Sequence, residues 1–276
     1  MRIVVTGATG TVGRRVVARL LAAGVEVRAV TRQPEAAALP AGVEVVAGDL
    51  ERPETLDQVF VGADRVYLFP AAAPVADEVV QRIRLAGVRR IVVLSGTTAD
   101  DPDEAGGEDY RLVERAVERS GLEWTHVRPG MFAGNARDWA ESIRAEGVVR
   151  LVYGDVAQAP VHEDDIAEVA VAALLTDGHV GARYPLSGPE SLTKFEQVQA
   201  IGRALGRELT VEELTPEQWR EAMAEELPEE VTEWLLDLWA KRVGRPEPVL
   251  STVEQVTGRP ARTLEEWAID HAEDFR

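Results

Sequence analysis

A short apolar run near the start of the chain leads directly into a glycine-rich turn, and this pairing restricts the fold more than any other feature. Ile3–Val5 is typical of a buried strand, and Thr6–Gly13 follows it with glycines spaced Gly-x-x-Gly-x-x-Gly. Valines and leucines then recur at helical spacing from residue 12 to residue 21. A strand, a glycine turn and a helix in this order are typical of the first unit of a dinucleotide-binding α/β sheet.

The three glycines have separate tasks in such a turn. Gly7 permits the tight turn, Gly10 lets the backbone approach a pyrophosphate, and Gly13 lets the helix pack closely on the sheet. The start of the helix then presents free N–H groups and a positive dipole end to the phosphates. A glycine-rich turn without a ligand is the alternative. The predicted phosphate-binding residues are Gly7, Thr9, Gly10, Thr11, Val12 and Gly13.

Strand and helix signals alternate through the first half of the chain. Helical patterns at 12–21 and 75–83 lie between apolar runs, and near-continuous apolar strands are what a sheet covered on both faces requires. The sequence therefore predicts an α/β fold with a Rossmann-type, doubly wound parallel sheet. The predicted strands are Ile3–Val5, Val25–Val30, Val43–Val46, Val66–Phe69, Ile91–Leu94 and Trp124–Val127.

The pattern changes near residue 150. Capping boxes at Thr193–Glu196, Thr215–Gln218 and Thr263–Glu266 each predict the start of a helix, and Asp165 with Glu168 predicts another ahead of Ile166. One strand candidate, Arg183–Leu186, is expected to rejoin the main sheet. We expect a dinucleotide-binding core over residues 1–150 and a smaller, mostly helical substrate-side part over residues 151–276, interleaved with that core.

Composition restricts the partners. The net charge of −18 disfavours nucleic acid and membrane surfaces, and no apolar run approaches the roughly 18 residues that span a bilayer. The absence of cysteine excludes disulfides, thiol nucleophiles and zinc–thiolate sites, and the four scattered histidines predict no metal site. With no leader ahead of the first strand, the expectation is a cytoplasmic protein. A small-molecule substrate, and at most a second copy of the chain as a homodimer, are the expected partners.

The end of the second predicted strand indicates which dinucleotide binds. NAD-binding folds usually carry Asp or Glu there, about 20 residues after the glycine turn, to bind the ribose hydroxyls. Thr31 and Arg32 occupy this place. A guanidinium can bind a 2′-phosphate in a forked geometry, whereas a carboxylate would repel it. The prediction is NADP(H), with a solvated surface role for Arg32 as the alternative.

Taken together, several motifs resemble the NmrA-like group of atypical short-chain dehydrogenases/reductases over essentially the whole chain. The resemblance implies a Rossmann core with a smaller substrate-side part. It places Asp49 and Leu50 near the adenine, and it places Phe69, Pro70 and Ser95 along the cofactor toward the nicotinamide. The motifs that carry the resemblance are Thr6–Gly13, Thr31-Arg32, Gly48-Asp49-Leu50, Leu94-Ser95, Arg128-Pro129-Gly130 and Thr257-Gly258-Arg259-Pro260.

The chain departs from the typical catalytic pattern of short-chain dehydrogenases. Those enzymes pair a tyrosine proton donor with a lysine four residues later, which lowers the pKa of the phenol. Tyr110 lies in the corresponding region, fifteen residues after Ser95, but Glu114 stands where the lysine would be. A carboxylate at this place is expected to raise the pKa of the phenol. Tyr110 is the candidate catalytic residue, and a packing role on its helix is an equal alternative.

These residues predict an NADPH-dependent oxidoreductase that reduces a small conjugated or aromatic carbonyl compound, such as a quinone, an enone or a ketone, by hydride transfer. Tyr153 and His162 are alternative polar contacts, with strand-end and ion-pair roles as their other interpretations. A non-catalytic NADP(H)-binding redox sensor is the alternative function, and a sugar-nucleotide epimerase or dehydratase is a weaker one. Two helical stripes are typical of core packing, and the resemblance places the substrate pocket in the same region: Trp219 with Met223, and Val231 with Trp234, Leu235 and Leu238.

Overall fold

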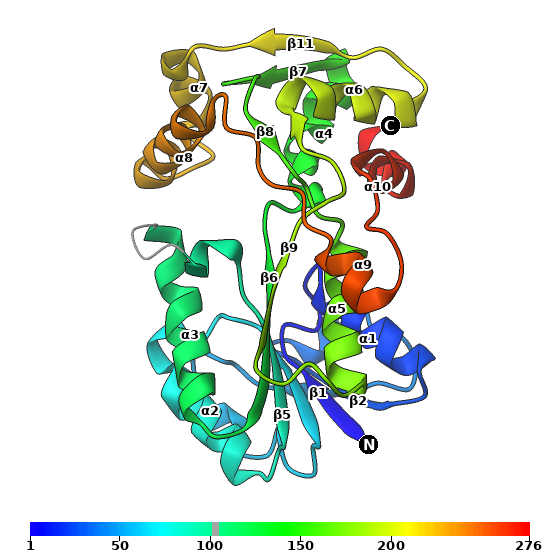
Figure 1. Cartoon of the computed structure of the whole chain (residues 1–276), viewed down its shortest axis with the longest axis vertical. Coiled ribbons are helices and arrows are strands. Elements are labelled where there is room, and N and C mark those ends of the chain that lie inside the picture. Colours follow the sequence, from blue (N-terminus) through cyan, green and yellow to red (C-terminus); the bar gives the residue numbers. More distant parts are fainter. Residues whose placement is uncertain (101–104) are drawn as a thin grey trace. The chain divides into compact units, whose positions relative to one another are not determined.

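The computed structural model describes residues 1–100 and 105–276, which form two compact units (Figure 1). The first unit consists of Met1–Gly130, Glu163–Leu186 and Thr252–Arg259, and the second consists of Met131–His162, Ser187–Ser251 and Pro260–Arg276. The first segment of the first unit therefore ends at Gly130, twenty residues before the expected boundary, and two later segments of the chain also belong to that unit. The chain interleaves the units because α5 (Glu163–Leu175) and β9 (Ala182–Leu186) return to the first sheet after residue 162.

The first unit is built on a parallel sheet of seven strands in the order β3-β2-β1-β4-β5-β6-β9. The order reverses at β1, which has β2 on one side and β4 on the other, so the sheet is doubly wound as predicted. All six predicted strands are present, and the Arg183–Leu186 candidate joins the sheet beside β6. The strands are β1 (Arg2–Val5), β2 (Glu26–Thr31), β3 (Glu44–Ala47), β4 (Arg65–Leu68), β5 (Arg90–Leu94), β6 (Glu123–Pro129) and β9 (Ala182–Leu186).

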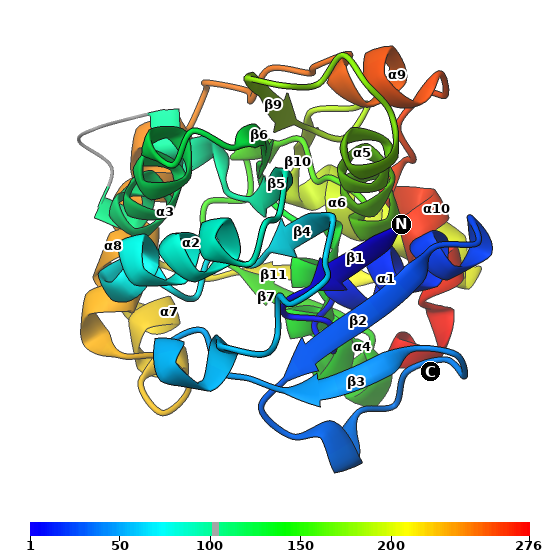
Figure 2. The same ribbon diagram turned by 90° about the horizontal axis from the view of Figure 1, so that it is seen from below.

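Helices cover both faces of this sheet, which is why its central strands are apolar on both sides. Figure 2 shows α2 and α3 on one face and α1 and α5 on the other. Buried side chains of β1, β4 and β5 pack against the α2 and α3 side in one core. The helices are α1 (Gly13–Ala22), α2 (Ala76–Leu85), α3 (Glu108–Arg119), α5 (Glu163–Leu175) and α9 (Thr252–Thr257), with short 3₁₀ turns η1 (Pro34–Ala36), η2 (Pro53–Leu56), η3 (Ala73–Val75), η4 (Thr97–Asp100) and η5 (Ala105–Gly107).

The second unit is mostly helical. Two short strand pairs, β7 with β11 and β8 with β10, are packed among its helices. One core surrounds Trp267 and Phe275, and a smaller cluster surrounds Trp219 and Leu236. The elements are η6 (Ala133–Trp139), α4 (Ala140–Glu146), β7 (Val148–Leu151), β8 (Ala157–Gln158), β10 (Leu192–Thr193), α6 (Lys194–Leu205), β11 (Thr210–Glu213), α7 (Pro216–Met223), α8 (Glu229–Arg242), α10 (Leu264–Asp270) and η7 (Ala272–Phe275).

Three of the four predicted helix starts are confirmed. Thr193, Thr215 and Thr263 each cap a helix in a complete capping box, in which the side chains of both box residues bond to the backbone. The fourth is wrong, because α5 begins at Glu163 and Asp165 lies buried within its first turn. Acidic residues stabilise the positive end of the helix dipole from any position of the first turn. Their presence therefore does not show which residue is the N-cap.

The predicted packing stripe of α8 is wrong at two positions. Val231 and Trp234 are 37% and 36% exposed, whereas Leu235 packs beside the Trp219 cluster and Leu236 is buried in it. The apolar residues of α8 are spread around most of the helix circumference, so its sequence pattern permits more than one buried face. The tertiary contact decides, because Trp239 meets Trp219 edge-on with ring centroids 5.1 Å apart. Among the residues that the structure describes, no helix has the length and apolarity required to span a bilayer.

Candidate cofactor and active site

The glycine turn after β1 leaves no room for larger side chains. Gly7 has a φ of 60°, and a Cβ there would fall 2.9 Å from Cβ of Phe69. A Cβ on Gly13 would lie 2.1 Å from the carbonyl oxygen of Gly7, so α1 can pack this closely only with glycine. The Gly10 amide donates to the Gly7 carbonyl at 3.0 Å and closes the turn.

The start of α1 fits a bound phosphate. Gly10 is exposed, and a Cβ there would approach only the Gly7 carbonyl oxygen, at 3.2 Å. Within the described part of the chain, no side chain caps the first turn of α1. The Arg14 and Arg15 amides donate to the Gly10 and Val12 carbonyls, so an anion would meet the amides ahead of Arg14, where the helix dipole favours negative charge. Pyrophosphate binding by this loop remains a prediction.

A hydroxyl that the sequence analysis did not single out fixes the reversal of strand order. Thr6 Oγ1 donates to the Tyr67 carbonyl at 3.1 Å and accepts from the Phe69 amide at 2.7 Å. These bonds join the end of β1 to the end of β4, the point at which an α/β sheet binds its ligand. The sequence signal for this role was the position of Thr6, directly ahead of the first glycine of the turn.

The residues predicted for the adenine side lie together. The Gly48 amide donates to the Thr31 carbonyl at 3.0 Å, so the turn after β3 lies beside the end of β2. Arg32 is exposed there and has no hydrogen bond or ion pair with any other described residue. The Asp49 carboxylate accepts from the Glu51 amide at 3.1 Å, which shapes the turn, and Leu50 is buried beneath it. Among the described residues, Arg32 is thus a cation without a partner, at the edge where the sequence predicts that a 2′-phosphate binds.

The residues predicted for the nicotinamide side follow β4 and β5. The ring of Phe69 lies against Gly7. Ser95 is buried at the end of β5, and its amide donates to the Val127 carbonyl at 2.7 Å. Tyr110, from the start of α3, lies against Gly96, the residue after Ser95. A Cβ on Gly96 would fall 2.8 Å from Cε2 of the Tyr110 ring. The structure therefore brings Tyr110 to the carboxyl end of the strand that carries Ser95.

The charge around Tyr110 differs from what the sequence suggested. Burial raises the pKa of Tyr110, and Asp109 raises it further. Glu114 was expected to cause this shift, and that reason is wrong, because its carboxylate binds Arg128. Arg128 Nε and Nη2 donate to the two Glu114 oxygens at 2.8 and 2.5 Å. The expected direction of the pKa shift holds, but burial is its main cause.

The Glu114 carboxylate is ionised although it is buried. Burial alone would raise the pKa of Glu114, but the hydrogen bond from Arg128, followed by His126 and Ser95, outweighs that effect and holds the pKa below its ordinary value. Arg128 also pairs with Asp100 on η4. This network was not predicted from the sequence. Its signal was an arginine directly ahead of Pro129, just after the predicted strand that carries His126.

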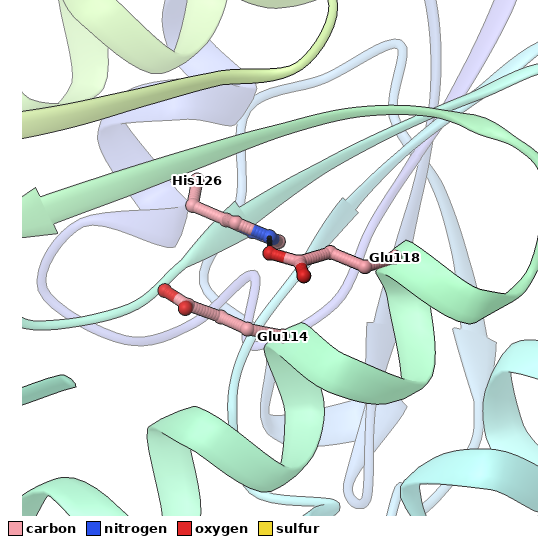
Figure 3. Close-up of side chains that lie close together, drawn as sticks. All are labelled: Glu114, Glu118 and His126. Carbon is pink, nitrogen blue, oxygen red and sulfur yellow. Dashed lines mark hydrogen bonds and ion pairs between the residues drawn. The ribbon is translucent and has the colours of Figure 1, made fainter. Parts of the chain in front are cut away.

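Glu114, Glu118 and His126 form a cluster whose ligand atoms lie within 4.8 Å of one another (Figure 3). His126 Nε2 lies 3.2 Å from a Glu118 oxygen, and burial lowers the pKa of this histidine. The carboxylates already have cationic partners, because Arg128 binds Glu114 and Arg183 binds Glu118. The cluster is therefore an arginine-neutralised ion-pair network between α3 and the sheet.

The two alternative polar residues lie in the second unit. Tyr153 has a φ of 53° and packs beside the Trp219 cluster. His162 is buried, and its Nε2 lies 3.6 Å from an Asp270 oxygen, as in the ion-pair role considered for it. Tyr110 is the only one of the three candidates that belongs to the unit carrying the phosphate loop.

Comparison with known proteins identifies the family. A model of NAD(P)H-binding domains matches residues 7–177, from the first glycine of the phosphate loop to the end of α5. This chain belongs to that family. The crystal structure of an NmrA variant has the same fold, with a TM-score of 0.76 at 20% identity over 98% of this chain and 94% of that one.

Several relatives are named reductases or oxidoreductases. A (4-alkanoyl-5-oxo-2,5-dihydrofuran-3-yl)methyl phosphate reductase of Streptomyces griseus is 43% identical over 99% of both chains. An NAD(P)H azoreductase of Xenophilus azovorans is 37% identical over 99% of both chains. The Escherichia coli quinone oxidoreductase QOR2, crystallised with NADPH, gives a TM-score of 0.84 at 25% identity over 98% of this chain and 99% of that one.

These findings confirm the predicted family, fold and enzyme class. The chain is an NAD(P)H-dependent reductase of small compounds with a Rossmann core and a helical C-terminal part. The expected cofactor, NADP(H), agrees with the NAD(P)H-binding description of the family model. The roles of the individual site residues remain predictions.

Proposed function

We propose that the protein uses NADPH to reduce a small conjugated carbonyl compound, such as a quinone, an enone or an aromatic ketone. The observation that carries this proposal is the position of Tyr110, which packs on Gly96 at the end of β5 in the unit that carries the phosphate loop. The relatives support the substrate class, because their names specify an acyl furanone phosphate, an azo compound and a quinone. Each of these compounds has an electron-poor conjugated system.

The preference for NADPH over NADH rests on Arg32. Its guanidinium is exposed at the end of β2 and has no partner among the described residues. A 2′-phosphate would supply that partner through charge-assisted hydrogen bonds. In a chain with a net charge of −18, such a contact also offsets the general repulsion of an anionic cofactor.

When bound, NADPH supplies the hydride, and the side chains orient the reactants and manage the proton. Burial and Asp109 raise the pKa of Tyr110, so its phenol is protonated at neutral pH and can donate a hydrogen bond to a developing oxyanion. Without a lysine beside it, the phenol is a weak acid. Conjugated acceptors need no stronger donor, because their product anion is delocalised.

A turnover assay tests this proposal. Purified protein is incubated with NADPH or NADH and a panel of quinones, enones, ketones and azo compounds, and cofactor oxidation is followed by absorbance. We expect oxidation of NADPH with at least one conjugated carbonyl compound, and slower oxidation of NADH. Tight NADPH binding without oxidation by any carbonyl acceptor would overturn the proposal and favour the redox-sensor alternative.

A further inference from the structure

A row of polar side chains runs between α3 and β6 beneath the proposed catalytic tyrosine. Tyr110, Glu114 and Glu118 are spaced by four residues and share one face of α3. Arg128 and His126, two residues apart, share the facing side of β6. Figure 3 shows Glu114 and Glu118 projecting from the helix toward His126 on the strand. Glu114 is the member of this row one helical turn from Tyr110.

Glu114 and Arg128 make the most buried ion pair of this row. Glu114 is 4% exposed and Arg128 is 6% exposed, and the guanidinium binds both carboxylate oxygens. A bidentate pair fixes the orientation of both side chains as well as the distance between them. Because α3 is rigid over one turn, a fixed Glu114 also fixes the position of Tyr110 against Gly96.

Arg128 also binds a third segment. Its Nη1 pairs with Asp100, the last residue of η4, which follows Gly96 on the chain. A second bond joins η4 to the start of α3, because Arg111 Nη1 donates to the Thr98 carbonyl at 3.3 Å. The guanidinium therefore links the turn after β5, the helix that carries Tyr110, and β6.

We propose that Arg128 and Glu114 are positioning residues, which hold the Tyr110 phenol against Gly96 in the orientation that donation to the developing oxyanion requires. This inference rests on the proposed function of Tyr110. The pair acts through Tyr110 and does not itself contact the reactants. It occupies the helical position at which a typical short-chain dehydrogenase places its lysine, but it supplies geometry instead of positive charge.

Stability alone is a weak reason for such a pair. Burying two charges costs solvation energy, and apolar residues of similar size often serve stability equally well. The chain also offers a matched comparison. Glu118, one turn further along α3, pairs with Arg183 of β9, and both of these side chains are partly exposed. A merely structural role would make the two glutamates similar in their effect on catalysis.

The test compares Glu114→Gln with Glu118→Gln, because both changes remove one charge from the same helix face. Turnover, KM, NADPH affinity and thermal stability are measured for each variant. We expect Glu114→Gln to lower kcat roughly 10- to 100-fold, the scale of a small misplacement at a reacting group, with NADPH affinity within about twofold of wild type. Glu118→Gln should retain the kcat of wild type. Equal kcat values for wild type and Glu114→Gln, or an equal loss in both variants, would overturn the proposal.

Two further variants exclude a folding defect. Glu114→Met with Arg128→Leu removes both charges together, so no buried charge is left unpaired. This double variant should fold and still show the loss in kcat. A Glu114→Gln change in a Tyr110→Phe background should cause little additional loss, because the pair acts through the phenol. Independent, multiplicative losses from the two changes would contradict the inference.

A readout that needs no turnover separates this inference from the proposed function. The chain has four tyrosines, so ¹³C-tyrosine labelling gives a small set of resonances, and the Tyr110 signal is assigned by its absence in Tyr110→Phe. Glu114→Gln should shift the Tyr110 resonance, and Glu118→Gln should leave it unchanged. If wild type oxidises no NADPH, the proposed function fails while this shift still tests the positioning. An unmoved Tyr110 resonance in Glu114→Gln would refute it.

Discussion

The ring of Tyr110 lies directly against Gly96, where an added Cβ would come within 2.8 Å of Cε2. A methyl group at residue 96 must therefore push the ring away from the end of β5. Gly96→Ala should lower kcat by roughly tenfold or more, because a displaced donor no longer faces the reacting oxygen. The cost in stability should be small, since the ring belongs to a side chain that can move. The check is kcat together with the unfolding temperature, and an unchanged kcat would show that the ring position is irrelevant.

Arg32 is expected to select the cofactor. Arg32→Ala removes a charge-assisted contact to the 2′-phosphate and should weaken NADPH binding by roughly 1.5–3 kcal/mol, about ten- to hundredfold. The affinity for NADH, which lacks this phosphate, should barely change. Titration of both cofactors against both proteins measures the difference. Equal weakening of NADPH and NADH would remove Arg32 from the 2′-phosphate site.

Gly10 is expected to admit the pyrophosphate. In Gly10→Val the added side chain would occupy the space that the pyrophosphate of the cofactor needs, so NADPH should no longer raise the unfolding temperature. Ala18→Val, at an exposed position of α1, is the control and should retain the cofactor-induced rise. Persistent stabilisation of Gly10→Val by NADPH would place the dinucleotide elsewhere.

A buried lysine in the second unit gives a pH-dependent prediction. Lys194 is 5% exposed, and its Nζ donates to the Val152 carbonyl at 2.8 Å and lies 3.4 Å from the centre of the Trp239 ring. Burial lowers the pKa of Lys194 from 10.5 to about 7, although Glu213 opposes the shift. Above pH 7 the unfolded chain holds this proton more tightly than the folded protein, so the cost of burying the charge should fade as the pH rises toward 10.5.

The free energy of unfolding of wild type relative to Lys194→Met should accordingly increase between pH 7 and about pH 10. Denaturant unfolding at a series of pH values gives this difference. Lys241 is the only other lysine of the chain and is exposed, so Lys241→Met provides the control and should show no such trend. A flat difference for Lys194→Met would mean that Lys194 stays charged in the folded protein.

Local sequence signals predicted the fold and the cofactor loop. The glycines from Gly7 to Gly13 are required by the local geometry of a turn, and the apolar strands by burial on both faces of a sheet. Both requirements produce patterns among residues close together in the sequence. The pairing of Glu114 with Arg128 connects a helix to a strand, and no local pattern reveals which of the nearby cations a carboxylate will meet. The face of α8 escaped prediction for a similar reason, because Trp239 is fixed by contact with Trp219 on another helix.

The most direct test of catalysis by Tyr110 is the kcat of Tyr110→Phe for NADPH oxidation with the best conjugated carbonyl acceptor. Because burial raises the pKa of Tyr110, the wild-type phenol should remain protonated, and kcat should not fall between pH 7 and about pH 9. Tyr184→Phe, which removes a phenol bonded to His179 at 2.8 Å in the same unit, is the control. We predict a loss of about 100-fold for Tyr110→Phe, near the lower limit for a general acid, with unchanged NADPH affinity and wild-type turnover for Tyr184→Phe. Full turnover by Tyr110→Phe would show that the phenol takes no part in catalysis.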